Sequence, residues 1–423
     1  ILVLVIGIVG TIAYLTDRDS EVNVFTMGEV EIDLQENFDQ NATLKPGVEI
    51  TKEVMIKNTG DDAAWVWYTY AVPMEAEGVV DVQCSTDGWS TPTLVGTEKI
   101  DDIWYGVYAC LYQTQLPADE TTNIGMQKVT LNSQVDYNVN DGKYYLVNAG
   151  VVTEIEYDVA KTKIPVNAYA IQTEGFDTVD AAYAAYGIQW GLGSYANTAL
   201  VDTPEDLQDA AKDGKDIVMG DDIEVAASKG GYNMAGIAPA SGTTFDGAGN
   251  TFSATGANTT WDCVVYTTGG TIKNMTIKGG FRGIFTAGCS SDIIIDNVVI
   301  DDVCYTLSSD GFNSNYSIIV TDSIINGWTS YTDGYKSVLF TDCKFGQGTG
   351  GYKYAYCRPY AETTFTNCEF EAGYEFDAVI LDDSVLPHPQ PLTLAERMER
   401  AVYLGLDEKN ITAKFVAGEK ILM

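Results

Sequence analysis

Several residue types that would support common functions are rare or absent in this sequence. Its 423 residues include a single histidine, His388, and no Cys-x-x-Cys pair, which argues against thiolate–imidazole zinc sites and excludes a His-Glu-x-x-His peptidase centre. Only 24 residues are lysine or arginine, against 60 aspartates and glutamates. The resulting net charge of -36 repels nucleic acids and anionic membrane surfaces, so we expect neither as a partner.

Long apolar segments are also scarce. The run Ile1–Ala13 has the length of a signal-peptide core, is too short to cross a bilayer as a helix, and ends in small residues of the kind that a signal peptidase recognises. We therefore expect residues 1–13 to be a signal-peptide core with a truncated leader, and the mature protein to be secreted without a stable membrane span. We attribute the excess of acidic residues to solubility outside the cell. We expect no cofactor. Calcium binding is the alternative, although no Asp-x-Asp-x-Asp-Gly loop with a distal glutamate is present.

The segment that follows this run resembles a known family. Gly10–Asp17 (GTIAYLTD) and Asn23–Gly28 (NVFTMG) are similar to the SipW-dependent signal and mature start of the TasA and camelysin family of Gram-positive surface proteins. The resemblance extends over about the first 190 residues. It implies a jelly-roll β-sandwich located at the cell surface or in a biofilm matrix, but the single histidine excludes the peptidase activity attributed to camelysins. Its further matches are Leu44–Gly47, Ile50–Lys52, Ile56–Gly60, Ile164–Val166 and Ala168–Gln172.

Hydrophobic periodicity also predicts an antiparallel β-sandwich over residues 14–190. Val30, Ile32 and Leu34 alternate with carboxylates, as in a strand with one buried face. Trp65–Tyr70 is aromatic on both faces, as in a central strand that is covered on both sides. We expect a helix near 177–186 at the end of this domain and a linker over 191–202.

The family resemblance further implies self-association. In TasA-like fibres the N-terminal segment of one subunit completes a sheet of the next subunit. Here that segment is Tyr14–Leu34, whose alternating part suits an added strand. The candidate donor-strand residues are Val22, Val24, Val30, Ile32 and Leu34.

The second half of the chain contains a repeat. Five short segments share an Asn or Asp in their second place, and successive positions differ by 23, 25, 20 and 25 residues. A period near 23 with one short strand in each repeat predicts a right-handed parallel β-helix over 203–383. Because a catalytic group is needed only once, we interpret the recurring residues as turn formers. They are Asn274, Asn297, Asp322, Asp342 and Asn367.

Helices are expected to cover both ends of the β-helix. Thr203 is a suitable N-cap, and Leu207, Ala210 and Ala211 lie on one side of the helix that would follow. The tail, 384–423, has a capping box at Thr393 and is predicted to hold a second capping helix. A separate docking segment is the alternative for this tail.

Eight cysteines in a secreted chain permit disulfides. Cys84 and Cys110 both fall in the first domain, which makes them candidate partners. Cys343 and Cys368 occupy the same place in neighbouring coils, which would put them within disulfide range. Stacked free thiols inside the coil are the alternative for the second pair.

Polysaccharide lyases and hydrolases are common among parallel β-helices, although this is an analogy of fold. The candidate catalytic residues are Arg282, Asp301, Asp302 and Arg358. The alternative for Asp301 and Asp302 is a solvated turn after a strand, and the alternative for the two arginines is a surface ion pair. Aromatic residues that crowd two successive coils indicate contact with sugar rings, or else packing over a loop. These candidates are Trp328, Tyr331, Tyr335, Tyr352, Tyr354 and Tyr356.

Together these features predict a secreted structural or adhesive protein of the cell surface or biofilm matrix, and no metal site. The sandwich would anchor the protein or polymerise, and the β-helix would project and contact glycans. The alternatives are a polysaccharide lyase or glycoside hydrolase with its active groove on the β-helix, and a purely structural stalk.

Overall fold

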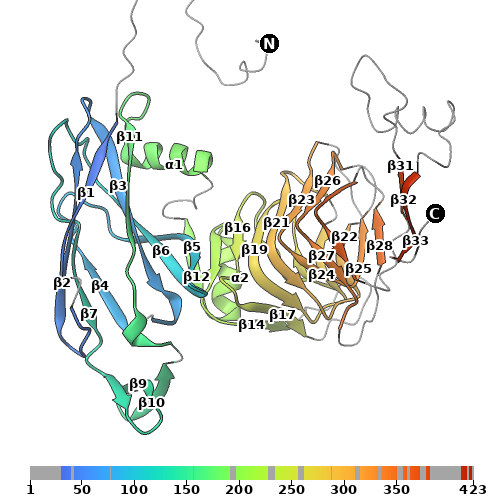
Figure 1. The fold of residues 1–423 in the computed structure, drawn as a ribbon, viewed down its shortest axis with the longest axis horizontal. Helices are drawn as coiled ribbons and strands as arrows, with labels where there is room; N and C mark the ends of the chain where they lie inside the picture. The colour runs from blue at the N-terminus through green and yellow to red at the C-terminus, as the bar shows by residue number, and fades with distance from the viewer. Residues whose placement is uncertain are drawn as a thin grey trace, which may run out of the picture.

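The computed structural model describes residues 30–39, 42–76, 78–155, 157–190, 197–226, 234–255, 262–286, 288–309, 315–331, 335–349, 356–359, 363–371, 378–381, 411–416 and 419–421. The signal-peptide core, 1–13, lies outside them. The fold is mostly β, with an N-terminal body followed by a parallel β-solenoid (Figure 1). The all-β prediction and the parallel β-helix are thereby confirmed at this level.

The N-terminal body contains two four-stranded antiparallel sheets that share one core. Val54 and Ile56 of the first sheet pack in one buried cluster with Val66, Tyr68 and Cys110 of the second. The alternation of Val30, Ile32 and Leu34 therefore corresponds to the apolar face that the first sheet turns toward the second. The first sheet has the order β1 (Ile32–Phe38), β2 (Glu49–Asn58), β7 (Met126–Leu131), β4 (Val80–Cys84), and the second β11 (Val166–Gln172), β3 (Ala64–Pro73), β6 (Ile103–Leu111), β5 (Thr93–Ile100).

The aromatic strand β3 is covered on both faces. On the side away from the shared core, helix α1 (Val179–Trp190) packs against it, and the Trp67 ring lies 5.5 Å from Tyr183 and 5.0 Å from Tyr186. This packing explains why a strand with no polar face is stable here. Short 3-10 turns at Met74–Ala76 and Val159–Lys161 complete the body.

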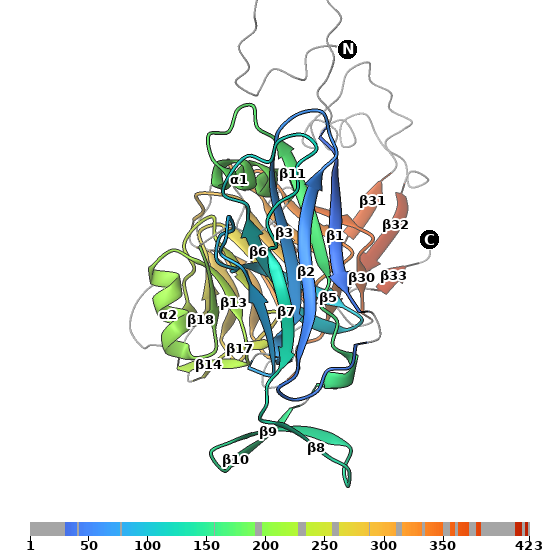
Figure 2. The same ribbon diagram turned by 90° about the vertical axis from the view of Figure 1, so that its left-hand side faces the viewer.

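A small antiparallel sheet projects from the body, as Figures 1 and 2 show. Its strands are β10 (Val151–Ile155), β9 (Lys143–Asn148) and β8 (Val135–Asn138). Val135 and Ile155 anchor it to a second core cluster of the body. The sequence analysis did not identify this sheet.

The solenoid consists of parallel strands stacked in register. Each core residue lies on its counterpart in the next coil, as in Phe245 on Ile272, Ile295 on Val320 and Phe340 on Phe365. One wall contains β12 (Thr198–Val201), β13 (Asp216–Met219), β16 (Thr244–Asp246), β19 (Gly270–Lys278), β21 (Ile293–Ile300), β23 (Ile318–Thr321), β26 (Val338–Thr341) and β29 (Thr363–Thr366), joined by β14 (Ile223–Ala226), β17 (Thr251–Thr255), β24 (Ile324–Asn326), β27 (Lys344–Gly346) and β30 (Glu369–Phe370). The other wall contains β15 (Met234–Ile237), β18 (Asp262–Tyr266), β20 (Arg282–Thr286), β22 (Tyr305–Ser309), β25 (Trp328–Tyr331) and β28 (Tyr356–Pro359).

The recurring Asn and Asp residues form turns, as the sequence indicates. All five have positive φ angles between 49° and 55°, a conformation that Asn and Asp tolerate better than other side chains. The amide of Asn297 donates to Asn274 Oδ1 at 2.9 Å, and Asn274 in turn donates to Asp246 Oδ1 at 3.1 Å. Their shared role is therefore to turn the backbone and to link neighbouring coils.

A strand of the solenoid lies inside the range predicted as a linker, 191–202. Strand β12 pairs in parallel with β13, because Thr198–Val201 continues the register of the wall. Helix α2 (Pro204–Lys212) begins at the expected N-cap, where Thr203 Oγ1 accepts from Asp206 N, and Leu207 is fully buried in the solenoid core.

The described part of the tail contains the strands β32 (Ile411–Val416) and β33 (Glu419–Ile421). They form an antiparallel sheet with β31 (Ala378–Leu381), which lies at the end of the range predicted as β-helix. The helix predicted after Thr393 lies outside the described residues and stays a prediction.

Candidate functional site

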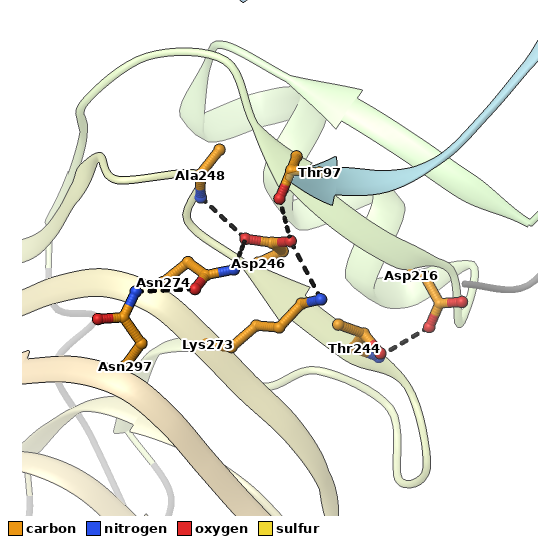
Figure 3. A network of polar contacts seen from close by, with 8 residues as sticks. All are labelled: Thr97, Asp216, Thr244, Asp246, Ala248, Lys273, Asn274 and Asn297. Atoms are coloured by element: carbon orange, nitrogen blue, oxygen red, sulfur yellow. Dashed lines mark hydrogen bonds and ion pairs between the residues drawn. The ribbon is translucent and has the colours of Figure 1, made fainter. Parts of the chain in front are cut away.

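The best-defined polar cluster lies where the N-terminal body meets the solenoid (Figure 3). At its centre is Asp246, at the end of β16, whose side chain is 1% exposed. Its carboxylate accepts hydrogen bonds from Thr97 Oγ1 of strand β5 at 2.6 Å and from Ala248 N at 2.9 Å. It also accepts from Asn274 and lies 3.4 Å from the ammonium of Lys273.

This carboxylate is thus satisfied by four neighbours. A buried charge without partners would cost several kcal/mol, whereas this one is compensated by an ion pair and three hydrogen bonds. Of its partners, only Thr97 comes from the N-terminal body. Asp246 therefore acts as a structural link between the two parts of the chain. We refer to this cluster as the joint.

Apolar packing and close backbone contact extend the joint. Leu94 of β5 packs in one small cluster with Val218 and Ala248 of the solenoid. The Trp104 ring of β6 lies on the backbone of Gly249, where a Cβ atom would come within 2.1 Å of Trp104 Nε1. Strand β5 also contacts β12, the first strand of the solenoid wall. The N-terminal body therefore covers the starting edge of the solenoid, which protects it from pairing with other chains.

A cavity of about 190 Å³ lies beside the joint. Its walls include Tyr70, Glu98, Tyr183 and Asp216. Burial raises the pKa of Glu98 above its ordinary value, while Asp216 accepts a 2.7 Å hydrogen bond from Thr244 N. Two carboxylates at this cavity, Asp216 and Asp246, thus accept hydrogen bonds that stabilise the fold. These bonds favour a structural role of the two residues over acid–base chemistry.

The structure gives the predicted catalytic residues structural contacts. The Arg282 guanidinium is buried, lies 4.4 Å from the ring centroid of Phe285, and donates to Ser308 Oγ at 3.3 Å. Asp301 accepts from Thr349 N at 2.8 Å and from Asn326 at 3.3 Å, and so joins successive coils. Asp302 has a φ of 51° and forms the adjacent turn.

The side chain of the fourth candidate, Arg358, lies outside the described residues, although its backbone belongs to β28. The three described candidates are engaged in packing and turns. Catalysis by these residues stays a prediction.

The predicted sugar-binding aromatics are only partly described. Trp328 is half-buried and stacks on Tyr305 with 4.7 Å between ring centroids and 32° between planes; Tyr305 in turn lies 5.6 Å from Phe281. Rings in this arrangement turn their faces toward one another, whereas a sugar ring needs an open face. This geometry supports the alternative of structural packing.

Among the other aromatic candidates, Tyr335 alone has a described side chain. Tyr335 is 5% exposed and packs in the solenoid core. Tyr352 and Tyr354 lie outside the described residues, as do the side chains of Tyr331 and Tyr356. Glycan contact therefore stays a prediction.

Sequence reasoning missed Phe281 and Tyr305, although a signal was present. Tyr305 precedes Trp328 by 23 residues, and Phe281 precedes Tyr305 by 24, which is the coil period. Applying the repeat to aromatic residues would have predicted this stack. The joint had no comparable signal, because Thr97 and Asp246 are 149 residues apart.

The donor-strand candidates complete a sheet of their own chain. Leu34 of β1 pairs with Ile56 of β2, and Val30, Ile32 and Leu34 pack against the shared core of the body. In the described part of the chain β1 is the last strand of its sheet. Val22 and Val24 lie outside the described residues.

All eight cysteines are thiols in this structure. Both candidate pairs lie close together. Within each pair the thiols shift each other's pKa: that of Cys84 is lowered and that of Cys110 raised, and that of Cys368 is lowered and that of Cys343 raised. In the second pair the two sulfurs also donate to backbone carbonyls of the coils, Cys343 to Thr341 O and Cys368 to Phe340 O.

Within the described ranges, no group of three or more His, Cys, Asp or Glu side chains could hold a metal ion. The helices described there are all too short or too polar to cross a membrane. A scan against protein-family models finds no match for this sequence, and a search of curated proteins finds none either. The resemblance to the TasA and camelysin family accordingly stays a prediction.

Proposed function

We propose that the protein is a secreted structural protein of the Gram-positive cell surface or biofilm matrix, which self-associates by exchanging its N-terminal strand and projects a β-solenoid arm. The observation that carries the proposal is the position of β1. This strand lies at a sheet edge, close to the N-terminal end of the described chain, and contributes apolar side chains to the core. A strand at the edge of a sheet can leave it without separating any other pair of strands.

Exchange of β1 conserves its contacts. All seven residues Ile32–Phe38 pair with β2, and the same pairs can form with β2 of a second copy. A strand that left would expose the edge of β2 and an apolar groove, both of which favour capture of another strand. The energetic difference between the closed monomer and the exchanged chain is then small, and protein concentration decides between them.

A half-buried ion pair holds β1 in either arrangement. Lys52 of β2 is almost buried, forms a 2.7 Å ion pair with Glu36, and lies 4.7 Å from the ring centroid of Phe38. Because both partners of Lys52 come from β1, loss of the strand leaves an unpaired cation. The contact therefore favours a filled groove, whichever copy supplies the strand.

In this proposal the two sheets of the body form the jelly-roll sandwich that the resemblance implies. The solenoid winds right-handed, as nearly all parallel crossover connections do. Helix α2 covers the first coil, which its buried Leu207, Ala210 and Ala211 support. The joint then fixes the direction in which the arm projects from an assembled body.

Electron microscopy of purified protein that starts near Tyr14 tests the proposal. We expect filaments with the full mature chain and monomers after deletion of Tyr14–Leu34. Leu34→Asp should also prevent assembly, because it places a charge at the core, whereas Asp33→Asn on the exposed side of β1 should not. Monomers from the unaltered chain at all concentrations, or filaments from the deletion variant, would contradict strand exchange.

A synthetic peptide that spans Tyr14–Phe38 supplies an independent test. Added in excess, it should occupy the groove of β2 and shorten the filaments, whereas a peptide of scrambled order should have no effect. Equal effects of the two peptides would count against a strand-specific groove.

A further inference from the structure

Two cysteines in the N-terminal body face each other across its core. Cys84 is the last residue of β4, at the edge of the first sheet opposite to β1. Cys110 lies on β6, an inner strand of the second sheet, and is fully buried. They belong to different sheets, so contact between them bridges the two layers.

The two side chains meet in one apolar cluster, with Cys110 inside it and Cys84 packed against it. Each thiol shifts the pKa of the other. Tyr68 is the cross-strand neighbour of Cys110, and burial, followed by the two sulfurs, raises the pKa of its hydroxyl. That hydroxyl is buried and has no hydrogen-bond partner in the described part of the chain.

We propose that Cys84 and Cys110 form a disulfide that links the two sheets in the mature protein. The reaction breaks two S–H bonds and forms one S–S bond of about 2.0 Å. The two electrons and two protons pass to the disulfide of an exported thiol–disulfide oxidoreductase, whose S–S bond breaks to give two thiols.

Reactivity differs between the two sulfurs. The pKa of the Cys84 thiol lies below its usual value because Cys110 donates a hydrogen bond to it, and the same contact together with burial raises the pKa of Cys110. Cys84 is also the more exposed of the two. It is therefore the sulfur that first attacks the oxidant, and Cys110 resolves the mixed disulfide.

The position of the disulfide gives it a further role, which rests on the proposed strand exchange. When β1 leaves, the first sheet keeps β2, β7 and β4, and β4 pairs only with β7 in the described chain. A covalent link from β4 to β6 holds this remaining sheet against the second sheet. The body can then open at the β1 edge without separating at the other edge.

Mass spectrometry of the secreted protein tests the disulfide directly. The protein is denatured, alkylated without reductant and digested. We expect the fragments that carry Cys84 and Cys110 to be joined, two hydrogen atoms lighter than the separate thiols, and to separate after reduction. Full alkylation of both cysteines, or a link from either to a different cysteine, would overturn the proposal.

Stability measurements test what the link does. Closure of the loop between the two cysteines should raise the folding equilibrium constant of the body roughly 100-fold over the reduced protein. The double variant Cys84→Ala, Cys110→Ala should lose this dependence on reductant. The control Cys263→Ala, a buried cysteine of the solenoid, should retain it. A reductant effect on the unfolding of the N-terminal body that persists in the double variant would refute the assignment.

The two hypotheses can fail separately. A linked pair in a protein that never forms filaments leaves the disulfide standing and removes strand exchange. Filaments formed by protein whose Cys84 and Cys110 are both found as thiols would remove the disulfide and leave strand exchange intact.

Discussion

Replacement of Asp246 by alanine tests whether one buried carboxylate holds the joint together. Of its four partners, the Lys273 side chain is 27% exposed and can turn toward water, and the Thr97 hydroxyl can rotate. Two donors remain without an acceptor, namely the N–H of the buried Ala248 and the side-chain amide of Asn274. At about 1 to 2 kcal/mol for each orphaned donor, we expect Asp246→Ala to lower the free energy of unfolding by about 2 to 4 kcal/mol.

Urea unfolding followed by tryptophan fluorescence and circular dichroism measures this loss. Asp246→Asn keeps one acceptor oxygen and should cost less than the alanine variant. Thr97→Val removes only the contact from the N-terminal body and should cost about 1 kcal/mol. The reasoning would be refuted if Asp246→Ala cost under about 1 kcal/mol, or if the asparagine and alanine variants were equally unstable.

Three further predictions concern other parts of the molecule. Phe345 is fully buried among Phe340, Phe365 and Phe370, so Phe345→Ala should lower the free energy of unfolding of the solenoid by about 3 to 5 kcal/mol in urea titrations; a loss under about 1 kcal/mol would contradict the packing. Gly249 and Gly150 both have φ angles near 90°, but only Gly249 faces a neighbour, Trp104, so Gly249→Ala should lower the melting temperature more than Gly150→Ala, and equal shifts would count against the close contact. Burial raises the pKa of the Glu98 carboxyl above its ordinary value. The unfolded chain therefore loses this proton at a lower pH than the folded chain does, and the free energy of unfolding falls as the pH rises between these two pKa values. Glu98→Gln should therefore stabilise the protein at about pH 7 but not at about pH 3, and unfolding curves that show equal effects at both values would reject the burial argument.

The coils could be predicted because a solenoid repeats its local chemistry. One Asn or Asp per period marks the turn, and the β-branched residues around it mark the strand, so Asn274 and its counterparts locate the coils without knowledge of any distant contact. The strands of the body were likewise visible in the alternation of Val30, Ile32 and Leu34.

The joint could not be predicted, because its partners are brought together only by the complete fold. Asp246 is one of many acidic residues at strand ends, and nothing nearby in the sequence indicates that Thr97 will donate to it. The tail shows a different limit. Residues 411–415 alternate apolar and polar side chains, as in a strand, and they form β32. The sequence analysis predicted only a helix in the tail, from the capping box at Thr393.

In-register stacking also makes the arm adjustable in length. Each coil takes 20 to 25 residues and adds about 4.8 Å, and every coil presents the same kind of surface to the next. Loss or duplication of one whole repeat would leave the remaining pairs and both ends of the arm unchanged. Recombination within the coding sequence can therefore alter the reach of the arm in discrete steps, without the design of any new interface.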